Sequence, residues 1–255
     1  MLEVVQLSKI YEGKVPFRAL SNINISIDEG EFVGIMGPSG SGKTTLLNCI
    51  STIDQPTSGL VTIGGANPHQ LKQNDLAKFR RRELGFVFQD FNLLNTLTVE
   101  ENIVLPMTLD NKPVREMKQK VKEIAEILGI EGILNKRINE ISGGQMQRAA
   151  VARAMIHQPK IVLADEPTGN LDSKSSRDVM SLLASLNETY KTTMMLVTHD
   201  PTAASYCDRV IFIRDGELYS EIYKGDNRQV FFQKIIDTIS LMGGNGDDLS
   251  KIRIQ

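Results

Sequence analysis

A glycine-rich segment, residues 37–44, carries the most specific chemical pattern in the sequence. It matches G-x-x-x-x-G-K-[S/T] and consists of Gly37, Pro38, Ser39, Gly40, Ser41, Gly42, Lys43 and Thr44. An apolar strand-sized run, Phe32–Met36, precedes it, and an apolar helical run, Thr45–Ile50, follows. Glycines allow a tight turn whose N–H groups face an anion, and the following helix directs its positive end there. We therefore expect nucleotide phosphates to bind here, with Lys43 adding a charge and Thr44 a hydroxyl ligand for Mg²⁺. The alternative, a glycine turn without a ligand, fits this strand–loop–helix context poorly.

Two carboxylates follow a second apolar run. Ile161–Ala164 leads into Asp165 and Glu166, and ligands of doubly wound sheets bind at the carboxyl ends of strands. Asp165 is placed to hold Mg²⁺, and Glu166 to orient and deprotonate an attacking water. A third run, Met194–Val197, leads to His199, which we expect to contact the terminal phosphate. Taken singly, these residues also fit solvated strand ends and a structural histidine; beside the phosphate loop, the catalytic interpretation is favoured.

A mostly parallel sheet is needed to bring these residues together. The three apolar runs, joined by Val210–Ile213, are too short for helices and lack alternation, which is typical of strands buried on both faces. Helical patterns cover Val114–Leu128 and Ser173–Tyr190, and Asp172 is a candidate N-cap for the second. Strands that alternate with helices predict an α/β fold.

Three other regions depart from this alternation. The first 30 residues and Gly59–Gly65 contain short strand-like pieces, which predict an antiparallel edge. Residues 90–158 lack a strong strand signal and are expected to be a helical insertion. Gln229–Met242 predicts an amphipathic helix, followed by the glycine-rich break Gly243–Asp248. Its expected apolar side comprises Val230, Phe231, Ile235, Ile239 and Met242. This helix either packs on the core, with a frayed end, or docks on a partner.

Composition narrows the class of protein. The 255 residues include 29 Lys and Arg against 31 Asp and Glu, a net charge of −2, which gives no electrostatic footprint for wrapping nucleic acid. Cys49 and Cys207 are too far apart in sequence for a metal motif or a disulfide framework and favour a reducing compartment. The amino terminus does not resemble a signal peptide, and no apolar run is long enough to span a membrane. We expect a soluble chain whose membrane span, if any, belongs to a partner.

Residues 141–154 connect these patterns to a family. Ile141-Ser142-Gly143-Gly144-Gln145 resembles the signature sequence of ATP-binding cassette (ABC) proteins, usually Leu-Ser-Gly-Gly-Gln, and Met146–Ala154 resembles the helix that follows it. The phosphate loop, the Asp165-Glu166 strand and His199 occur in the family's order. The resemblance covers roughly residues 1–225. It implies a P-loop ABC nucleotide-binding domain with an antiparallel β edge, a helical subdomain at about 90–158, and a C-terminal helical extension over 226–255.

The resemblance also implies roles for single residues. Tyr11 is similar to the aromatic residue that stacks on adenine, and Gln89 to the glutamine that contacts Mg²⁺ and the attacking water and begins a transporter-facing loop. Their alternatives are an ordinary strand tyrosine and a polar strand end. Asp172 corresponds to the loop that links two sites across a dimer. The implied nucleotide contacts further include Thr45, Ser142, Gly143, Gly144 and Gln145.

In this family two copies pack head to tail. Ser142 and Gly144 of one chain would then close over the terminal phosphate of ATP bound to the other chain. The implied partners are therefore a second copy and an integral membrane permease, at the cytoplasmic face of the membrane. Two departures are small: Ile141 replaces leucine, and Gly169-Asn170 replaces the commoner Ser-Ala. The implied activity is ATP hydrolysis.

Longer segments suggest a branch. Residues 165–172 and 88–94 resemble the branch that contains macrolide-efflux and lipoprotein-releasing ATPases. Within it, residues 92–99, residues 198–206 and the tail resemble the bacitracin-resistance type, which acts against antimicrobial peptides. A soluble cassette ATPase acting on DNA or ribosomes is the alternative from another class. The basic run Lys78–Arg82 is expected to be a solvated helix face and not a nucleic-acid site.

Overall fold

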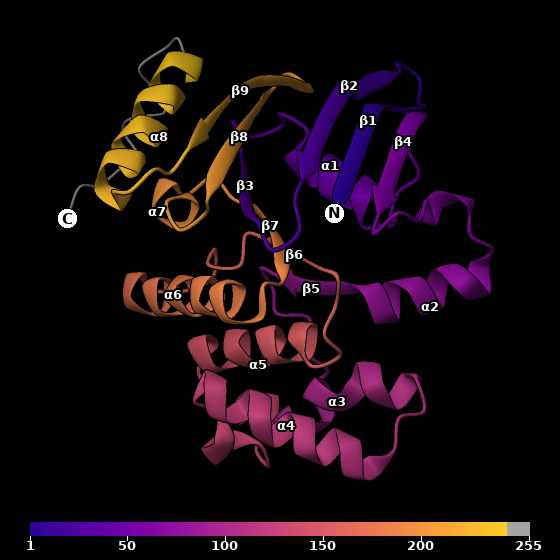
Figure 1. Cartoon of the computed structure of the whole chain (residues 1–255), viewed down its shortest axis with the longest axis vertical. Helices are drawn as coiled ribbons and strands as arrows, with labels where there is room; N and C mark the ends of the chain where they lie inside the picture. Colours follow the sequence, from indigo (N-terminus) through magenta and orange to yellow (C-terminus); the bar gives the residue numbers. More distant parts are fainter. Residues whose placement is uncertain (244–255) are drawn as a thin grey trace.

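Six strands form the central sheet of the computed structural model, which describes residues 1–243 (Figure 1). Their order is β5-β6-β7-β3-β8-β9, parallel throughout except for the antiparallel pair β8 and β9. The strands are β3 (Phe32–Met36), β5 (Leu84–Phe88), β6 (Ile161–Asp165), β7 (Thr193–Val197), β8 (Arg209–Arg214) and β9 (Glu217–Tyr223). β3 and β7 are buried at every residue, as expected for a sheet covered on both faces. The predicted parallel core is confirmed.

A second, antiparallel sheet has the order β2-β1-β4. It consists of β1 (Leu2–Tyr11), β2 (Phe17–Ile27) and β4 (Ser58–Ile63), which confirms the predicted antiparallel edge. α1 (Lys43–Ile50) contacts β2 of this sheet and β6 and β7 of the central sheet. Its buried Leu46, Leu47 and Ile50 share one apolar cluster with residues of both sheets. The first turn of α1 is thereby fixed relative to the strand ends of the central sheet.

Three helices occupy most of residues 90–158 and lie below the sheets in Figure 1. They are α3 (Val99–Leu109), α4 (Val114–Leu128) and α5 (Gly143–Met155). Thr98 and Glu101 form a reciprocal capping box at the start of α3, and Gly129 ends α4 in the left-handed conformation. α5 contacts α3 and α4 on one side and β5 and α6 on the other. It therefore connects the helical region to the central sheet.

The remaining helices cover or flank the sheets. They are α2 (Gln73–Glu83), α6 (Ser173–Tyr190), α7 (Pro201–Ala204) and α8 (Arg228–Gly243), with short 3₁₀ turns at Pro68–Gln70, Glu131–Ile133 and Ile138–Glu140. Both α4 and α6 have the predicted bounds. The Asp172 carboxylate caps α6 by accepting from the backbone N–H groups of Lys174 and Ser175, as predicted.

The basic run on α2 differs from its prediction as a solvated face. Arg80 donates to the hydroxyl of Thr52, while Arg81 and Arg82 both pair with Asp110, which follows α3. Their cations lower the pKa of the Asp110 carboxyl. Part of the run therefore binds α2 to neighbouring elements. The guanidinium groups reach acceptors that are about 30 residues away in the sequence and close only in the fold.

The C-terminal helix packs on the core. Phe231, Ile235 and Met242 of α8 are buried and the helix contacts α7 and β9, as Figure 1 shows. Val230 is 53% exposed, so its predicted place on the apolar side was wrong: adjacent helical residues point about 100° apart. The predicted break Gly243–Asp248 lies, apart from Gly243, outside the described residues. No helix within residues 1–243 has the length and hydropathy needed to span a membrane.

Phe231→Ala tests how far α8 contributes to stability. Phe231 is fully buried, and removal of a buried aromatic ring typically costs about 3–5 kcal/mol. We expect the free energy of unfolding, measured by urea denaturation, to fall by about 3 kcal/mol. The matched control Val230→Ala should change it by less than about 0.5 kcal/mol, because that side chain is largely in solvent. Equal effects of the two variants would contradict the packing described here.

Candidate functional site

The phosphate loop has the geometry predicted for it. β3 ends at Met36, residues 37–42 turn, and α1 begins at Lys43. Gly37 and Gly42 adopt positive φ angles of 155° and 101°. A Cβ atom at Gly37 would lie 2.0 Å from the carbonyl oxygen of Ile213, and one at Gly42 would lie 2.5 Å from that of Ala19. Only glycine fits at these two positions.

This loop has the polar groups that a phosphate requires. No side chain caps α1, so the N–H groups of its first turn remain available to a ligand. The Ser41 hydroxyl is buried and has no hydrogen-bond partner in the protein. The Nζ of Lys43 donates to the carbonyl oxygens of Gly37 and Pro38, both at 2.9 Å. Burial lowers the pKa of Lys43, and the nearby Glu166 and Asp165 oppose that shift. The residues present therefore fit a polyphosphate.

The carboxyl ends of β6 and β7 place Asp165, Glu166 and His199 together. Asp165 lies opposite Val197 in the parallel register, and Val197 lies opposite Ile35 of β3. Burial raises the pKa of Asp165, the neighbouring Glu166 carboxylate raises it further, and Lys43 opposes the rise. The sheet thus gathers two carboxylates and the loop lysine at one edge.

Glu166 is held in one orientation by three contacts. Its Oε1 lies 2.7 Å from the Nδ1 of His199, its Oε2 accepts from the Thr198 hydroxyl at 3.0 Å, and its N–H donates to the Val197 carbonyl. A carboxylate only accepts, so the His199 ring donates from Nδ1. The backbone of Glu166 adopts a φ of +45°, a strained value for a residue with a long side chain. Strain of this kind is typical of functional sites.

Gln89 lies beside the loop that follows Glu166. It comes directly after β5, whose Phe88 pairs with Asp165. Its Nε2 donates to the side-chain oxygen of Asn170 at 3.3 Å. The structure therefore brings Gln89 to the same edge as the two carboxylates.

Tyr11 lies at the end of β1, near Thr45 of α1. Its hydroxyl donates to Asp54 at 2.8 Å, and the Nζ of Lys9 sits 4.8 Å from the ring centroid. Burial and the Asp54 hydrogen bond raise the pKa of Tyr11, against the influence of Thr45 and Lys9. Tyr11 is 39% exposed and lies near Thr45, directly after the phosphate loop, so it is accessible for the predicted adenine contact.

The signature residues form a second group. Ser142 is the N-cap of α5 and makes a reciprocal capping box with Gln145. A Cβ at Gly144 would lie 3.2 Å from the Ser175 hydroxyl, and one at Gly143 would lie 3.5 Å from Leu171. Within residues 1–243, no hydrogen bond or ion pair joins residues 142–145 to residues 37–45. Gly143 and Gly144 therefore lie near the start of α6, which Asp172 caps.

Sequence reasoning missed three residues that position the site. The Gln147 side chain is fully buried and its Nε2 donates to the Pro167 carbonyl at 2.7 Å. Thr198 orients Glu166, and Asn170 contacts Gln89. Of the three, only Gln147 had a signal in the sequence, because it is a polar residue in a helix rich in alanine. The roles of Thr198 and Asn170 depend on contacts between distant segments.

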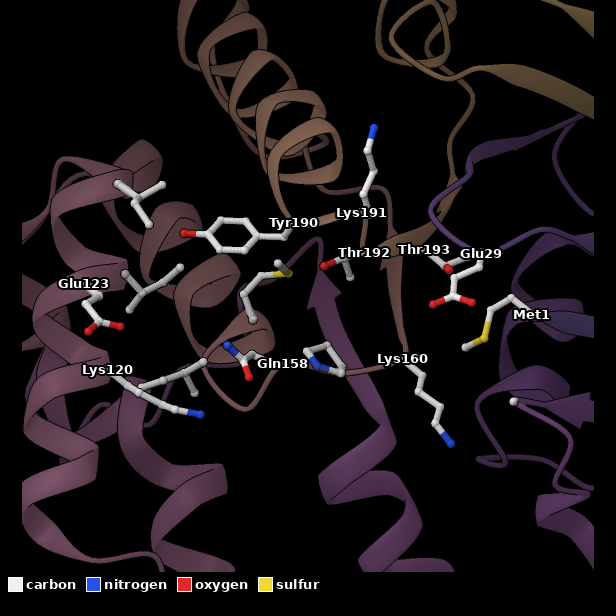
Figure 2. A pocket seen from close by; sticks show the side chains of 16 residues that line it. Met1, Glu29, Lys120, Glu123, Gln158, Lys160, Tyr190, Lys191, Thr192 and Thr193 are labelled. Carbon is white, nitrogen blue, oxygen red and sulfur yellow. The ribbon is translucent and has the colours of Figure 1, made fainter.

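A cavity of about 450 Å³ lies at the opposite edge of the sheet. Figure 2 shows its lining near Lys160 and Thr193, where β6 and β7 begin. Its charged side chains have mixed sign, including Lys120 and Glu123. The cavity lies at the amino ends of β6 and β7, whereas Asp165, Glu166 and His199 lie at the carboxyl ends, where parallel α/β sheets bind ligands. It is therefore separate from the candidate site.

Comparison with known proteins agrees with this geometry. Residues 20–169 match the ABC transporter family model. The ABC transporter ATP-binding protein YxdL of Bacillus subtilis is 61% identical over 100% of this chain and 99% of its own. The bacitracin export ATP-binding protein BceA of Halalkalibacterium halodurans is 51% identical over 97% of this chain and 99% of its own.

A solved structure agrees as well. The dimeric ABC transporter cassette MJ0796, from Methanocaldococcus jannaschii, superposes with a TM-score of 0.81 at 42% identity, over 89% of this chain and 100% of that one. The same cassette has also been solved as a dimer in a post-hydrolysis state with ADP and phosphate. Its phosphate loop, its two strand-end carboxylates and the helix that follows residues 141–145 are arranged as described, and the chain belongs to the ATP-binding, ATP-hydrolysing subunits of ABC transporters.

Proposed function

We propose that Glu166 is the general base of ATP hydrolysis. The observation that supports this role is that three hydrogen bonds hold Glu166 in one orientation. The His199 ring and the Thr198 hydroxyl each hold one carboxylate oxygen. A base held in this way accepts the proton of an attacking water without first losing side-chain freedom. We assign His199 to the terminal phosphate, and its side chain, which is 75% exposed, is accessible to a ligand. Lys43 and residues 37–42 bind the phosphates of ATP, and Thr45 and Tyr11 are assigned to the side of its adenine ring.

Mg²⁺ is the cofactor that these residues suit. We assign Asp165, the hydroxyl of Thr44 and the side-chain oxygen of Gln89 as its ligands. All three are oxygen donors, which Mg²⁺ prefers, and it commonly binds through few protein ligands together with substrate phosphates. Among residues 1–243 no group of three or more His, Cys, Asp or Glu side chains forms a ready-made metal site. When bound, the ion would neutralise charge that develops on the phosphate oxygens.

The signature group is assigned to the ATP of a second copy. Ser142, Gly143 and Gly144 open the 13-residue helix α5, whose N-terminus favours an anion, yet they make no polar contact with the phosphate loop of their own chain. The related MJ0796 cassette is dimeric. In a head-to-tail dimer, Ser142 and Gly144 would cover the terminal phosphate bound by the partner, and Asp172 would lie at the interface. ATP would then hold the dimer together.

Transport requires a membrane permease as the further partner, with this chain at the cytoplasmic face of the membrane. We assign the cassette to residues 1–225, its helical subdomain to about 90–158 and a C-terminal extension to 226–255. The cargo that the comparisons favour is an antimicrobial peptide of the bacitracin type, because BceA is similar over nearly its whole length. The work done on the peptide is export or removal from its lipid target.

Glu166→Gln separates binding from hydrolysis. The amide keeps the shape of the side chain but cannot take a proton at neutral pH, so turnover should fall by at least about 100-fold. ATP affinity should persist, and size-exclusion chromatography with ATP and Mg²⁺ should show a dimer. Adding Ser142→Ala to this variant should weaken the dimer while each chain still binds ATP. Unchanged turnover in Glu166→Gln would remove Glu166 as the base.

Asp165→Asn should lower the rate of ATP hydrolysis and raise the stability of the nucleotide-free protein. The folded-state pKa of Asp165 is raised from 3.8, chiefly by burial, so the ionised carboxylate destabilises the fold above that pKa. The neutral amide removes this cost, and without nucleotide the melting temperature at pH 8 should rise by about 2 °C. As the pH falls to 3.8, wild type protonates and the difference should disappear. A lower melting temperature of Asp165→Asn at pH 8 would show that Lys43 stabilises the carboxylate more than burial penalises it.

The cargo is tested in cells of the native host. Deletion of the gene for this chain should increase sensitivity to bacitracin-type peptides, measured as the inhibitory concentration. Wild type should restore resistance and Glu166→Gln should not, because the peptide is moved at the expense of ATP. A deletion strain with unchanged sensitivity to these peptides would exclude this class of cargo.

A further inference from the structure

Asn170 makes a reciprocal contact with the segment that follows β5. Its Nδ2 donates to the Asp90 carboxylate at 2.7 Å and to the Gln89 carbonyl at 3.2 Å. Its Oδ1 accepts from the Nε2 of Gln89 at 3.3 Å. One amide side chain thus engages both the backbone and the side chain of Gln89. An alanine at this position would make none of these contacts, because it has no side-chain donor or acceptor.

Gly169 supports the same contact through its size. A Cβ atom there would lie 2.8 Å from the Cδ and 2.9 Å from the Nε2 of Gln89. Any larger residue would therefore displace the Gln89 side chain. The departure Gly169-Asn170 acts as a unit, in which the glycine admits Gln89 and the asparagine holds it.

The loop that carries Asn170 is also tied to Glu166. The Gly169 N–H donates to the Glu166 carbonyl at 3.0 Å, and the Leu171 N–H donates to that of Thr168 at 3.1 Å. The buried Gln147 holds Pro167 from the other side. Through these hydrogen bonds a short turn of defined backbone conformation links Asn170 to Glu166.

We propose that Asn170 is a positioning residue that fixes Gln89 relative to Glu166, so that the base and the segment after β5 move as one unit. The inference rests on the proposed roles of Gln89 and Glu166 in ATP hydrolysis. Among the described residues, Asn170 makes no hydrogen bond to the phosphate loop, including Lys43. Its loss should therefore lower kcat and leave the KM for ATP and the melting temperature unchanged, whereas a merely structural role would lower the melting temperature.

Asn170→Asp is the sharpest variant. It replaces the donor that faces Asp90 by a carboxylate oxygen, and two carboxylates at hydrogen-bond distance repel each other. We expect kcat at saturating ATP and Mg²⁺ to fall by about three- to tenfold in the purified chain. Asn170→Ala, which removes the contacts without adding repulsion, should show a smaller fall in the same direction.

Asp90→Asn provides the matched control and the rescue. Alone, it should leave kcat close to wild type, because the amide at position 90 still offers an oxygen to Asn170. Combined with Asn170→Asp, it should restore at least half of the lost kcat, since an amide at position 90 donates to the carboxylate at position 170.

Two results would overturn the inference: wild-type kcat in Asn170→Asp, or a loss that Asp90→Asn does not reverse. Glu166→Gln separates these from a failure of the proposed function. If Glu166→Gln abolishes turnover while Asn170→Asp retains it, only the role of Asn170 is lost. If Glu166→Gln itself retains turnover, the proposed base is wrong.

Discussion

Parallel pairing of β6, β7 and β3 is the constraint on which the site depends. The pairs Asp165 with Val197 and Val197 with Ile35 align the carboxyl ends of three strands that are far apart in sequence. The phosphate loop, the two carboxylates and His199 leave the sheet from these ends. A shift of one residue in the β6–β7 pairing would move Glu166 away from Thr198 and His199. A shift in the β7–β3 pairing would displace the phosphate loop from all three residues. Burial of all three strands on both faces makes such a shift costly.

The charged groups at this edge of the sheet favour nucleotide binding at a cost to the stability of the fold. Two adjacent carboxylates, one of them partly desolvated, lie near a single half-buried lysine. The cost appears as opposite pKa shifts, with Asp165 raised and Lys43 lowered, both mainly by burial. Glu166 adds backbone strain at its positive φ. Proteins tolerate such local costs where function requires them, and the large apolar clusters on both sides of the central sheet offset them.

Amide side chains connect the parts of the site that the strands leave separate. Gln147 reaches from the signature helix to Pro167, and Asn170 reaches from the following loop to Gln89 and Asp90. An amide both donates and accepts, so one residue can join two backbone segments that otherwise share no hydrogen bonds. In a dimer of the proposed kind, the N-terminus of α5 would contact the ATP bound by the partner. Gln147 of the same helix would hold Pro167, next to Glu166 of its own chain. Each site would then depend on both chains.

Features that arise from local physics could be predicted from the amino-acid sequence. The glycines of residues 37–42, the strand-sized apolar runs, the bounds of α4 and α6 and the capping role of Asp172 all follow from backbone sterics, hydrophobic periodicity and local hydrogen bonding. Contacts between distant groups became evident only in the folded chain: Thr198 with Glu166, Asn170 with Gln89, and Arg81 and Arg82 with Asp110. It also turned Val230 toward solvent, because the rotation of α8 is set by the surface on which it packs. Side-chain pairs between segments depend on strand register and helix rotation, and these are fixed only when the whole core packs.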